Sequence, residues 1–153
     1  MITECYIKGR YDFGIGKCAV VVAEKGVLLH KVAWKVPSSW DYDGETILAD
    51  QYNCEILAAC YALDWCRKNE KELVNIYANT TTAKKWYYNQ EFPQSRMPMG
   101  KAYYKAYDDF CNDRDKKEVV NGRICAEYIP KDETNKWDIL VNDLAVNLTY
   151  SHP

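Results

Sequence analysis

The stretch Asn53-Cys54-Glu55-Ile56-Leu57-Ala58-Ala59-Cys60-Tyr61-Ala62-Leu63 decides the class of fold, because its apolar residues recur with helical spacing. The positions i, i+3, i+4 and i+7 of one helical face are Ile56, Ala59, Cys60 and Leu63. The alanines of this segment allow close packing against a neighbouring element. We therefore expect a helix over about Ile47–Asn69, with this face buried.

Working outward from this helix, the sequence alternates between strand-like and helix-like segments. Before it lie three β-rich runs, Cys5–Gly9, Lys17–Ala23 and Val27–Val36, and then a polar loop, Pro37–Glu45. After it come two predicted strands, Leu73–Ala78 and Arg123–Ile129, and three predicted helices, Thr80–Tyr88, Gly100–Asn112 and Asn135–Tyr150. The order β-β-β-α-β-α-α-β-α indicates one mixed α/β domain over residues 1–153.

The composition of the 153 residues excludes several classes of protein. The chain has 20 Lys and Arg against 22 Asp and Glu, which gives a net charge of -2. The net charge therefore does not indicate a nucleic-acid partner. No apolar run is long enough to cross a membrane, and the first five residues lack the features of a signal peptide. Seven scattered cysteines without a C-x-x-C motif favour free thiols over disulfides or zinc. We expect a cytoplasmic protein.

Four motifs, in this order along the chain, resemble ribonuclease H type 1. They match the family's opening hairpin, its first helix (a Glu followed by Ala-Ala-x-x-Ala-Leu), its fourth strand (ending in Asp-Ser), and its last strand with the closing helix (Asp-x-Leu-Ala). The matching segments are Tyr6–Tyr11 with Gly14–Val21, Asn53–Leu63, Val74–Thr80, and Tyr128–Lys131 leading into Asn142–Ala145. The resemblance implies a five-stranded mixed sheet of order 3-2-1-4-5 with helices on both faces.

The resemblance also implies a site, and this chain departs from it. Family members cleave the RNA strand of an RNA/DNA hybrid with two divalent ions held by four carboxylates. Carried over by position, Glu55 is the only matching carboxylate, whereas the other three positions hold Lys8, Asn79 and Asn142. The loop position of the family's catalytic histidine corresponds to Asp132. We therefore predict a non-catalytic domain without a metal cofactor.

In this predicted site, Lys8 takes the place of a metal ion and pairs with Glu55, and the two amides hydrogen-bond around the pair. In the alternative interpretation, other acidic residues bind Mg²⁺ or Mn²⁺ in a rewired site. The chain would then be an active nuclease for RNA/DNA hybrids. The acids available are Asp12, Asp132, Asp138 and Asp143. Asp138 shares a helical face with Asn142, whereas Asp143 should point elsewhere.

The interleaving of cations with aromatic residues suggests that nucleic acid, such as an RNA/DNA hybrid, is the partner. Cations bind phosphates while aromatic rings stack on sugars or bases. The residues concerned are Arg10, Thr80, Lys84, Lys85, Trp86 and Arg96. The alternative is that Trp86 packs its helix against the sheet and the lysines are solvated.

Tyrosines concentrated in the second half of the chain suggest a second class of function. A catalytically empty domain with an aromatic surface could be a scaffold that binds a protein partner. The tyrosines concerned are Tyr87, Tyr88, Tyr103, Tyr104 and Tyr107.

Overall fold

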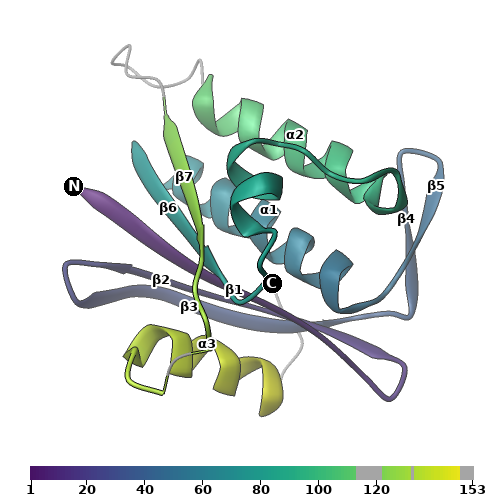
Figure 1. The fold of residues 1–153 in the computed structure, drawn as a ribbon, viewed down its shortest axis with the longest axis horizontal. Helices are drawn as coiled ribbons and strands as arrows, with labels where there is room; N and C mark the ends of the chain where they lie inside the picture. Colours follow the sequence, from purple (N-terminus) through teal and green to yellow (C-terminus); the bar gives the residue numbers. More distant parts are fainter. Residues whose placement is uncertain (113–121, 132, 149–153) are drawn as a thin grey trace.

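The computed structural model describes residues 1–112, 122–131 and 133–148, which build a five-stranded sheet with helices on both faces (Figure 1). Its strands lie in the order β3-β2-β1-β6-β7. Their bounds are Ile2–Asp12 for β1, Ile15–Glu24 for β2, Val27–Val36 for β3, Leu73–Ala78 for β6 and Arg123–Tyr128 for β7. The first three strands pair antiparallel, and β6 joins β1 and β7 in parallel. This arrangement confirms the predicted 3-2-1-4-5 order. The predicted fourth and fifth strands are labelled β6 and β7, because an additional hairpin precedes them in the chain.

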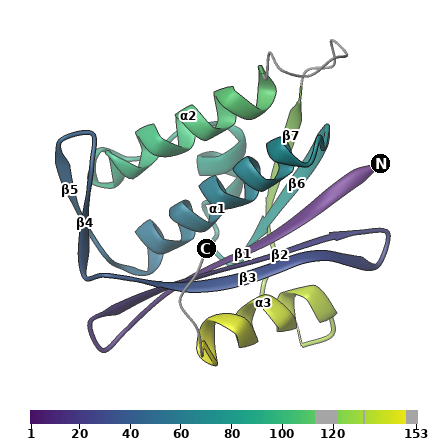
Figure 2. The same cartoon turned by 180° about the vertical axis from the view of Figure 1, so that it is seen from behind.

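Within the described ranges, three α-helices cover the sheet. Helices α1 (Gln51–Lys68) and α2 (Met99–Cys111) lie on one face, and α3 (Lys136–Val146) lies on the other (Figures 1 and 2). The Asp50 side chain caps α1 by accepting from the Asn53 amide, and Asn135 caps α3 in the same way. No helix in the described part of the chain is long and apolar enough to cross a membrane.

Each face of the sheet has its own core, so the position of a residue along a strand decides which helix it meets. The larger core lies under α1 and α2 and contains the predicted apolar face of α1. The smaller core lies under α3 and consists of Tyr6, Ala19, Val21, Ala33, Val141 and Ala145. Because side chains alternate along a strand, Lys8 and Arg10 of β1 share the α3 side of the sheet with Tyr6.

Gly9 lets α1 approach β1 closely. A Cβ atom at this position would overlap the backbone of Gln51 and Glu55. The absence of a side chain therefore allows the first turns of α1 to rest directly on the strand, and it places Glu55 at this crossing.

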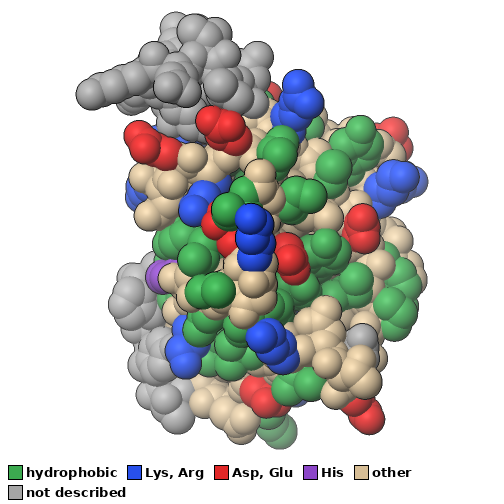
Figure 3. All heavy atoms as spheres, turned by 90° about the vertical axis from the view of Figure 1, so that its left-hand side faces the viewer, with side chains coloured by type: hydrophobic (Ala, Val, Ile, Leu, Met, Phe, Trp, Pro, Cys, Tyr) green, Lys and Arg blue, Asp and Glu red, His purple; other side chains and the backbone are tan. Residues whose placement is uncertain are grey.

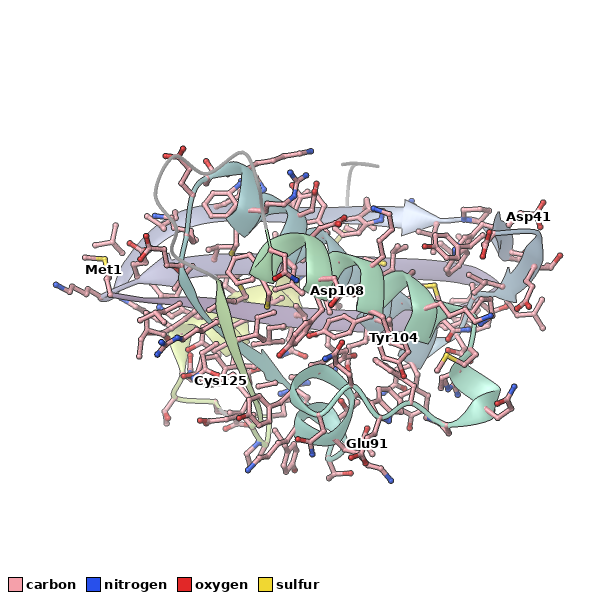
Figure 4. All side chains as sticks on the ribbon, turned by 90° about the horizontal axis from the view of Figure 1, so that it is seen from above. Met1, Asp41, Glu91, Tyr104, Asp108 and Cys125 are labelled. Carbon is pink, nitrogen blue, oxygen red and sulfur yellow. The ribbon has the colours of Figure 1, made fainter. Side chains whose placement is uncertain are left out.

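Two segments differ from the sequence-based expectation. The predicted loop Pro37–Glu45 contains most of a hairpin, β4 (Ser39–Tyr42) paired with β5 (Glu45–Leu48). The turn residues Asp43 and Gly44 have φ values of 50° and 78°, as a tight hairpin turn requires. In Figure 4, Asp41 of this hairpin lies at the opposite end of the molecule from Met1.

The predicted helix Thr80–Tyr88 is largely absent. Only a five-residue π-helical turn, η1 (Lys84–Tyr88), forms there. At the start of this segment, the Thr80 hydroxyl donates to the Glu55 carboxylate. The segment that follows holds one short 3-10 turn, η2 (Gln94–Arg96).

Candidate functional site

Side chains from both faces of the sheet meet near the C-terminal ends of β1 and β6. Glu55 comes from α1 on one side, whereas Lys8 of β1 lies on the side covered by α3. Asn79 and Thr80 follow β6 directly, and Asn142 comes from α3. The structure therefore brings these four positions to one end of the sheet. Lys8 makes no hydrogen bond with a described residue, one hydrogen-bond network joins Asn79, Asn142 and Asp138, and another surrounds Glu55.

Glu55 is the buried acid of this network, with 3% of its surface exposed. Its Oε1 accepts hydrogen bonds from the Tyr87 hydroxyl at 2.6 Å and the Thr80 hydroxyl at 2.8 Å. Burial raises the pKa of Glu55, while these two hydrogen bonds and the charge of Lys8 oppose that rise. The Tyr87 contact was not predicted, because the sequence predicted a helix over Thr80–Tyr88, whereas only the turn η1 forms there and the direction of the Tyr87 side chain differs accordingly.

The second oxygen of Glu55 is open. No described residue hydrogen-bonds to Oε2. Within the described ranges, the buried side-chain polar atom without a partner is Asn75 Oδ1, so Oε2 of Glu55 keeps contact with solvent. One oxygen of this carboxylate is thus fixed, and the other is available to a ligand.

Lys8 is half-buried and has no ion pair or hydrogen bond with any residue that the structure describes. Desolvation lowers its pKa, Lys131 and Arg10 lower it further, and Glu55 and Asp138 raise it. The predicted ion pair between Lys8 and Glu55 is therefore wrong, although the two charges interact through space. The physical reason is that the two side chains approach from opposite faces of the sheet.

Asn79 and Asn142 bond to each other and to Asp138, not to Lys8 and Glu55 as expected. The Asn142 amide donates to Asn79 Oδ1 at 3.2 Å, to the Asp138 carbonyl at 2.8 Å and to Asp138 Oδ1 at 3.2 Å. The Asn79 amide donates to Asp138 Oδ1 and to the Ile129 carbonyl, both at 3.1 Å. Asp138 is 2% exposed, so the cluster holds a second buried carboxylate.

The placement of Asp138 confirms that it shares a helical face with Asn142. Asp143 is exposed, also as predicted. Asp12 lies at the end of β1, where it bonds to Arg10 and Lys17, and Asp132 lies outside the described residues. Among those described, no group of three or more His, Cys, Asp or Glu side chains could hold a metal ion.

A cavity of about 430 Å³ lies next to this network. Three of the residues predicted to bind nucleic acid, Thr80, Trp86 and Arg96, line it, together with Gln51, Tyr52, Asn79, Thr81 and Thr82. Trp86 is 6% exposed, and its ring meets the Tyr52 ring edge-on with 5.9 Å between the ring centres. This burial agrees with the alternative interpretation, in which Trp86 packs against the rest of the domain. Lys84 and Lys85 are exposed on η1, while Arg10 lies on β1.

Arg96 closes one side of this cavity. Its guanidinium group lies 4.9 Å from the centre of the Tyr52 ring, and it donates to Asp50 Oδ2 at 2.6 Å. Because Asp50 Oδ1 caps the Asn53 amide at 2.7 Å, one carboxylate holds both Arg96 and the start of α1.

The tyrosines proposed as a protein-binding surface are mostly packed inside. Tyr87 and Tyr103 are fully buried, and the Tyr103 hydroxyl donates to the Tyr87 carbonyl at 2.6 Å. Tyr104, on α2 in Figure 4, is partly buried against the core, as is Tyr107. Of the five, Tyr88 is exposed, at 44%.

A second cavity, of about 270 Å³, lies between the β4–β5 hairpin and helices α1 and α2. Its floor is apolar, and its charged rim residues pair with one another: Arg67 with Asp64, and Lys105 with Asp109, both at 2.7 Å. This cavity is separate from the network around Glu55.

Comparison with solved structures identifies the fold. The ribonuclease H1 of the halophilic archaeon Halobacterium salinarum superimposes with a TM-score of 0.66 at 11% identity, over 96% of this chain and 98% of that chain. The N-terminal ribonuclease H domain of Rv2228c from Mycobacterium tuberculosis gives 0.68 at 12%, over 95% and 94%. LC11-RNase H1, solved in complex with an RNA/DNA hybrid, gives 0.65 at 14%, over 95% and 97%.

This mixed sheet with helices on both faces is the ribonuclease H-like fold. No protein-family model matches the sequence. No curated protein matches it either.

Proposed function

We propose that this chain is a nucleic-acid-binding domain of the ribonuclease H fold that does not act as a two-metal nuclease, with an RNA/DNA hybrid as its ligand. The observation that carries the proposal is the Lys8 ammonium group, which feels the charges of the buried carboxylates Glu55 and Asp138 but makes no ion pair with any described residue. A cation in this position repels metal ions and attracts phosphate.

The donor set does not fit a pair of divalent ions. Two such ions need several anionic oxygens to bind them and to offset their mutual repulsion. This site offers Glu55 and Asp138, whose Oδ1 atom already accepts from Asn79 and Asn142. With Lys8 included, the formal charge of the ionised site is -1.

The cavity beside the site supports binding. Its threonine hydroxyls and the Arg96 guanidinium group are donors suited to phosphate or sugar oxygens, and Tyr52 and Trp86 offer aromatic surface. LC11-RNase H1, which shares this fold, was solved with an RNA/DNA hybrid. The burial of most of the tyrosines gives the protein-scaffold alternative no specific support.

Fluorescence anisotropy with a labelled RNA/DNA hybrid tests the proposal, with duplex DNA and duplex RNA as competitors. We expect equal affinity in Mg²⁺ and in EDTA, and no cleavage products in either. Lys8→Met should weaken binding roughly fivefold or more, since it removes one phosphate contact. Lys25→Met, at the β2–β3 turn, is the matched control and should leave affinity unchanged. Metal-dependent cleavage that Glu55→Gln abolishes would establish the rewired nuclease instead, and an absence of binding would refute the proposal.

A further inference from the structure

Three basic residues lie directly opposite one another across three neighbouring strands. The β1–β2 register pairs Arg10 with Lys17, and the β2–β3 register pairs Lys17 with Lys35. Residues paired in this way project from the same face of a sheet. We call Arg10, Lys17 and Lys35 the basic row.

The basic row lies on the α3 side of the sheet, beyond the part that α3 covers. Ala19 on β2 and Ala33 on β3 each lie two residues from the lysine of the row on the same strand. Both alanines still pack against α3. Within the row, the Arg10 side chain is 35% exposed, the Lys17 side chain is 18% exposed, and Lys35 is exposed. The row is therefore open to a ligand.

One acid partly neutralises the row. Asp12 accepts from Arg10 at 2.9 Å and 3.2 Å and from Lys17 at 3.5 Å. Lys35 has no ion pair with any residue in the described ranges. Three positive charges against one negative leave a formal charge of +2, even though like charges directly opposite one another destabilise a sheet.

This arrangement contrasts with the other end of the molecule. Figure 3 shows the end at which β1 begins, where blue, red and green side chains are intermixed and no extended area of one charge is visible. The basic row lies towards the β1–β2 turn, at the opposite end of β1 (Figure 2).

The row also continues the site around Lys8. Arg10 follows Lys8 by two residues on the same face of β1, which separates their Cα atoms by about 6.6 Å. Adjacent strands are about 4.8 Å apart, so the row spans about 10 Å from Arg10 to Lys35. A nucleic-acid strand carries one phosphate per about 3.4 Å of helix axis, so about three phosphates match this length.

We infer that the basic row binds the backbone phosphates of the nucleic-acid strand as it leaves the Lys8 site. The inference rests on the proposed function and adds a second contact surface to it. The row distinguishes no bases, because a line of cations meets only the sugar–phosphate backbone. It extends the length of nucleic acid bound, and it makes affinity depend on salt.

Charge reversal on β3 tests the inference. The variant is Lys35→Glu and the matched control is Lys31→Glu, an exposed lysine on the same strand and face. With a labelled RNA/DNA hybrid long enough to pass both Lys8 and Lys35, Lys35→Glu should weaken binding roughly fivefold or more. It should also reduce the slope of log affinity against log salt by about one. Lys31→Glu should change neither quantity appreciably.

The possible outcomes separate the two proposals. If Lys8→Met weakens binding but Lys35→Glu and Lys31→Glu have the same effect on hybrid affinity, the basic row does not contact the nucleic acid. Only this inference then fails. If the wild-type chain binds no nucleic acid, both proposals fail. Binding of the wild-type chain to phosphatidylserine vesicles that Lys35→Glu abolishes, with hybrid affinity unchanged, would assign the row to a membrane surface and overturn the inference.

Discussion

The Tyr87 hydroxyl donates a 2.6 Å hydrogen bond to Oε1 of Glu55, which joins a fully buried tyrosine to a carboxylate of which only 3% is exposed. A hydrogen bond to a carboxylate in such surroundings is stronger than one between neutral groups. It fixes the orientation of the carboxylate, so Oε2 is the oxygen that faces a ligand. A tyrosine that touches nothing outside the protein therefore sets the geometry of the site.

Glu55→Gln should stabilise the protein at neutral pH. Folding raises the pKa of Glu55 above its ordinary value of 4.5, so ionisation of this group costs stability. The stability it contributes is complete below about pH 4 and is lost as the pH rises through the folded-state pKa. A glutamine never ionises, and its Oε1 can still accept from Tyr87 and Thr80. The measurement is urea unfolding across this pH range: the variant should match the wild type at low pH and exceed it at pH 7. A constant difference at every pH would contradict the prediction.

Tyr87→Phe should destabilise the wild-type protein by about 1.5–3 kcal/mol, because it removes a buried hydrogen bond to a charged group. In the Glu55→Gln background the same change removes a bond between neutral groups and should cost only about 0.5–1.5 kcal/mol. A double-mutant cycle by chemical denaturation measures this difference. Equal costs in the two backgrounds would mean that Glu55 is neutral in the folded protein at the pH used.

Lys8→Met should leave the protein as stable as the wild type or more stable, by no more than about 1 kcal/mol. Folding lowers the pKa of Lys8 from 10.5. The charged form therefore costs stability below the folded-state pKa, and this cost disappears as the pH rises to the unfolded value. Thermal unfolding at pH 7 is the check. A loss of more than about 2 kcal/mol would show that Lys8 makes a structural ion pair of the buried kind.

Lys8 and Glu55 should show weak energetic coupling. Because no ion pair joins them, a cycle of Lys8→Met and Glu55→Gln should give at most about 1 kcal/mol. Coupling of about 3 kcal/mol or more would indicate direct contact in solution.

Gly9→Ala should destabilise the fold by at least about 2 kcal/mol, because a methyl group there overlaps the backbone of Gln51 and Glu55. Since α1 must move to make room, hybrid binding should weaken in the same variant. Unfolding in urea together with binding anisotropy provides both measurements, and a change in stability of less than about 0.5 kcal/mol would contradict the close approach.

The succession of strands and helices could be predicted from the sequence because most elements have a clear period, and the strand order could be predicted because four motifs resemble ribonuclease H type 1. The β4–β5 hairpin escaped prediction although Asp43-Gly44 is a turn signal, because the flanking strands are only four residues each. In place of the predicted helix Thr80–Tyr88 only the turn η1 forms, and the side chains of Thr80 and Tyr87 both bond to Glu55, a tertiary contact that the local sequence pattern does not indicate.

The site could be predicted as a set of positions but not as a set of contacts. Helical spacing correctly placed Asp138 beside Asn142, since both lie on one short helix. It could not show that Lys8 and Glu55 approach from opposite faces of the sheet, because that depends on how α1 crosses β1 at Gly9. The predicted ion pair between Lys8 and Glu55, which rested on their opposite charges, was therefore wrong.

Asp50 connects the cavity to the helix that carries Glu55. A phosphate that draws the Arg96 guanidinium away from Asp50 Oδ2 leaves this carboxylate with the Asn53 amide as its remaining hydrogen-bond partner in the described chain. Ligand occupancy would then be transmitted to the first turn of α1 as a change in fraying. The hydrogen-exchange rate of the Asn53 amide becomes a reporter of events at the cavity, read from a backbone atom that no ligand touches.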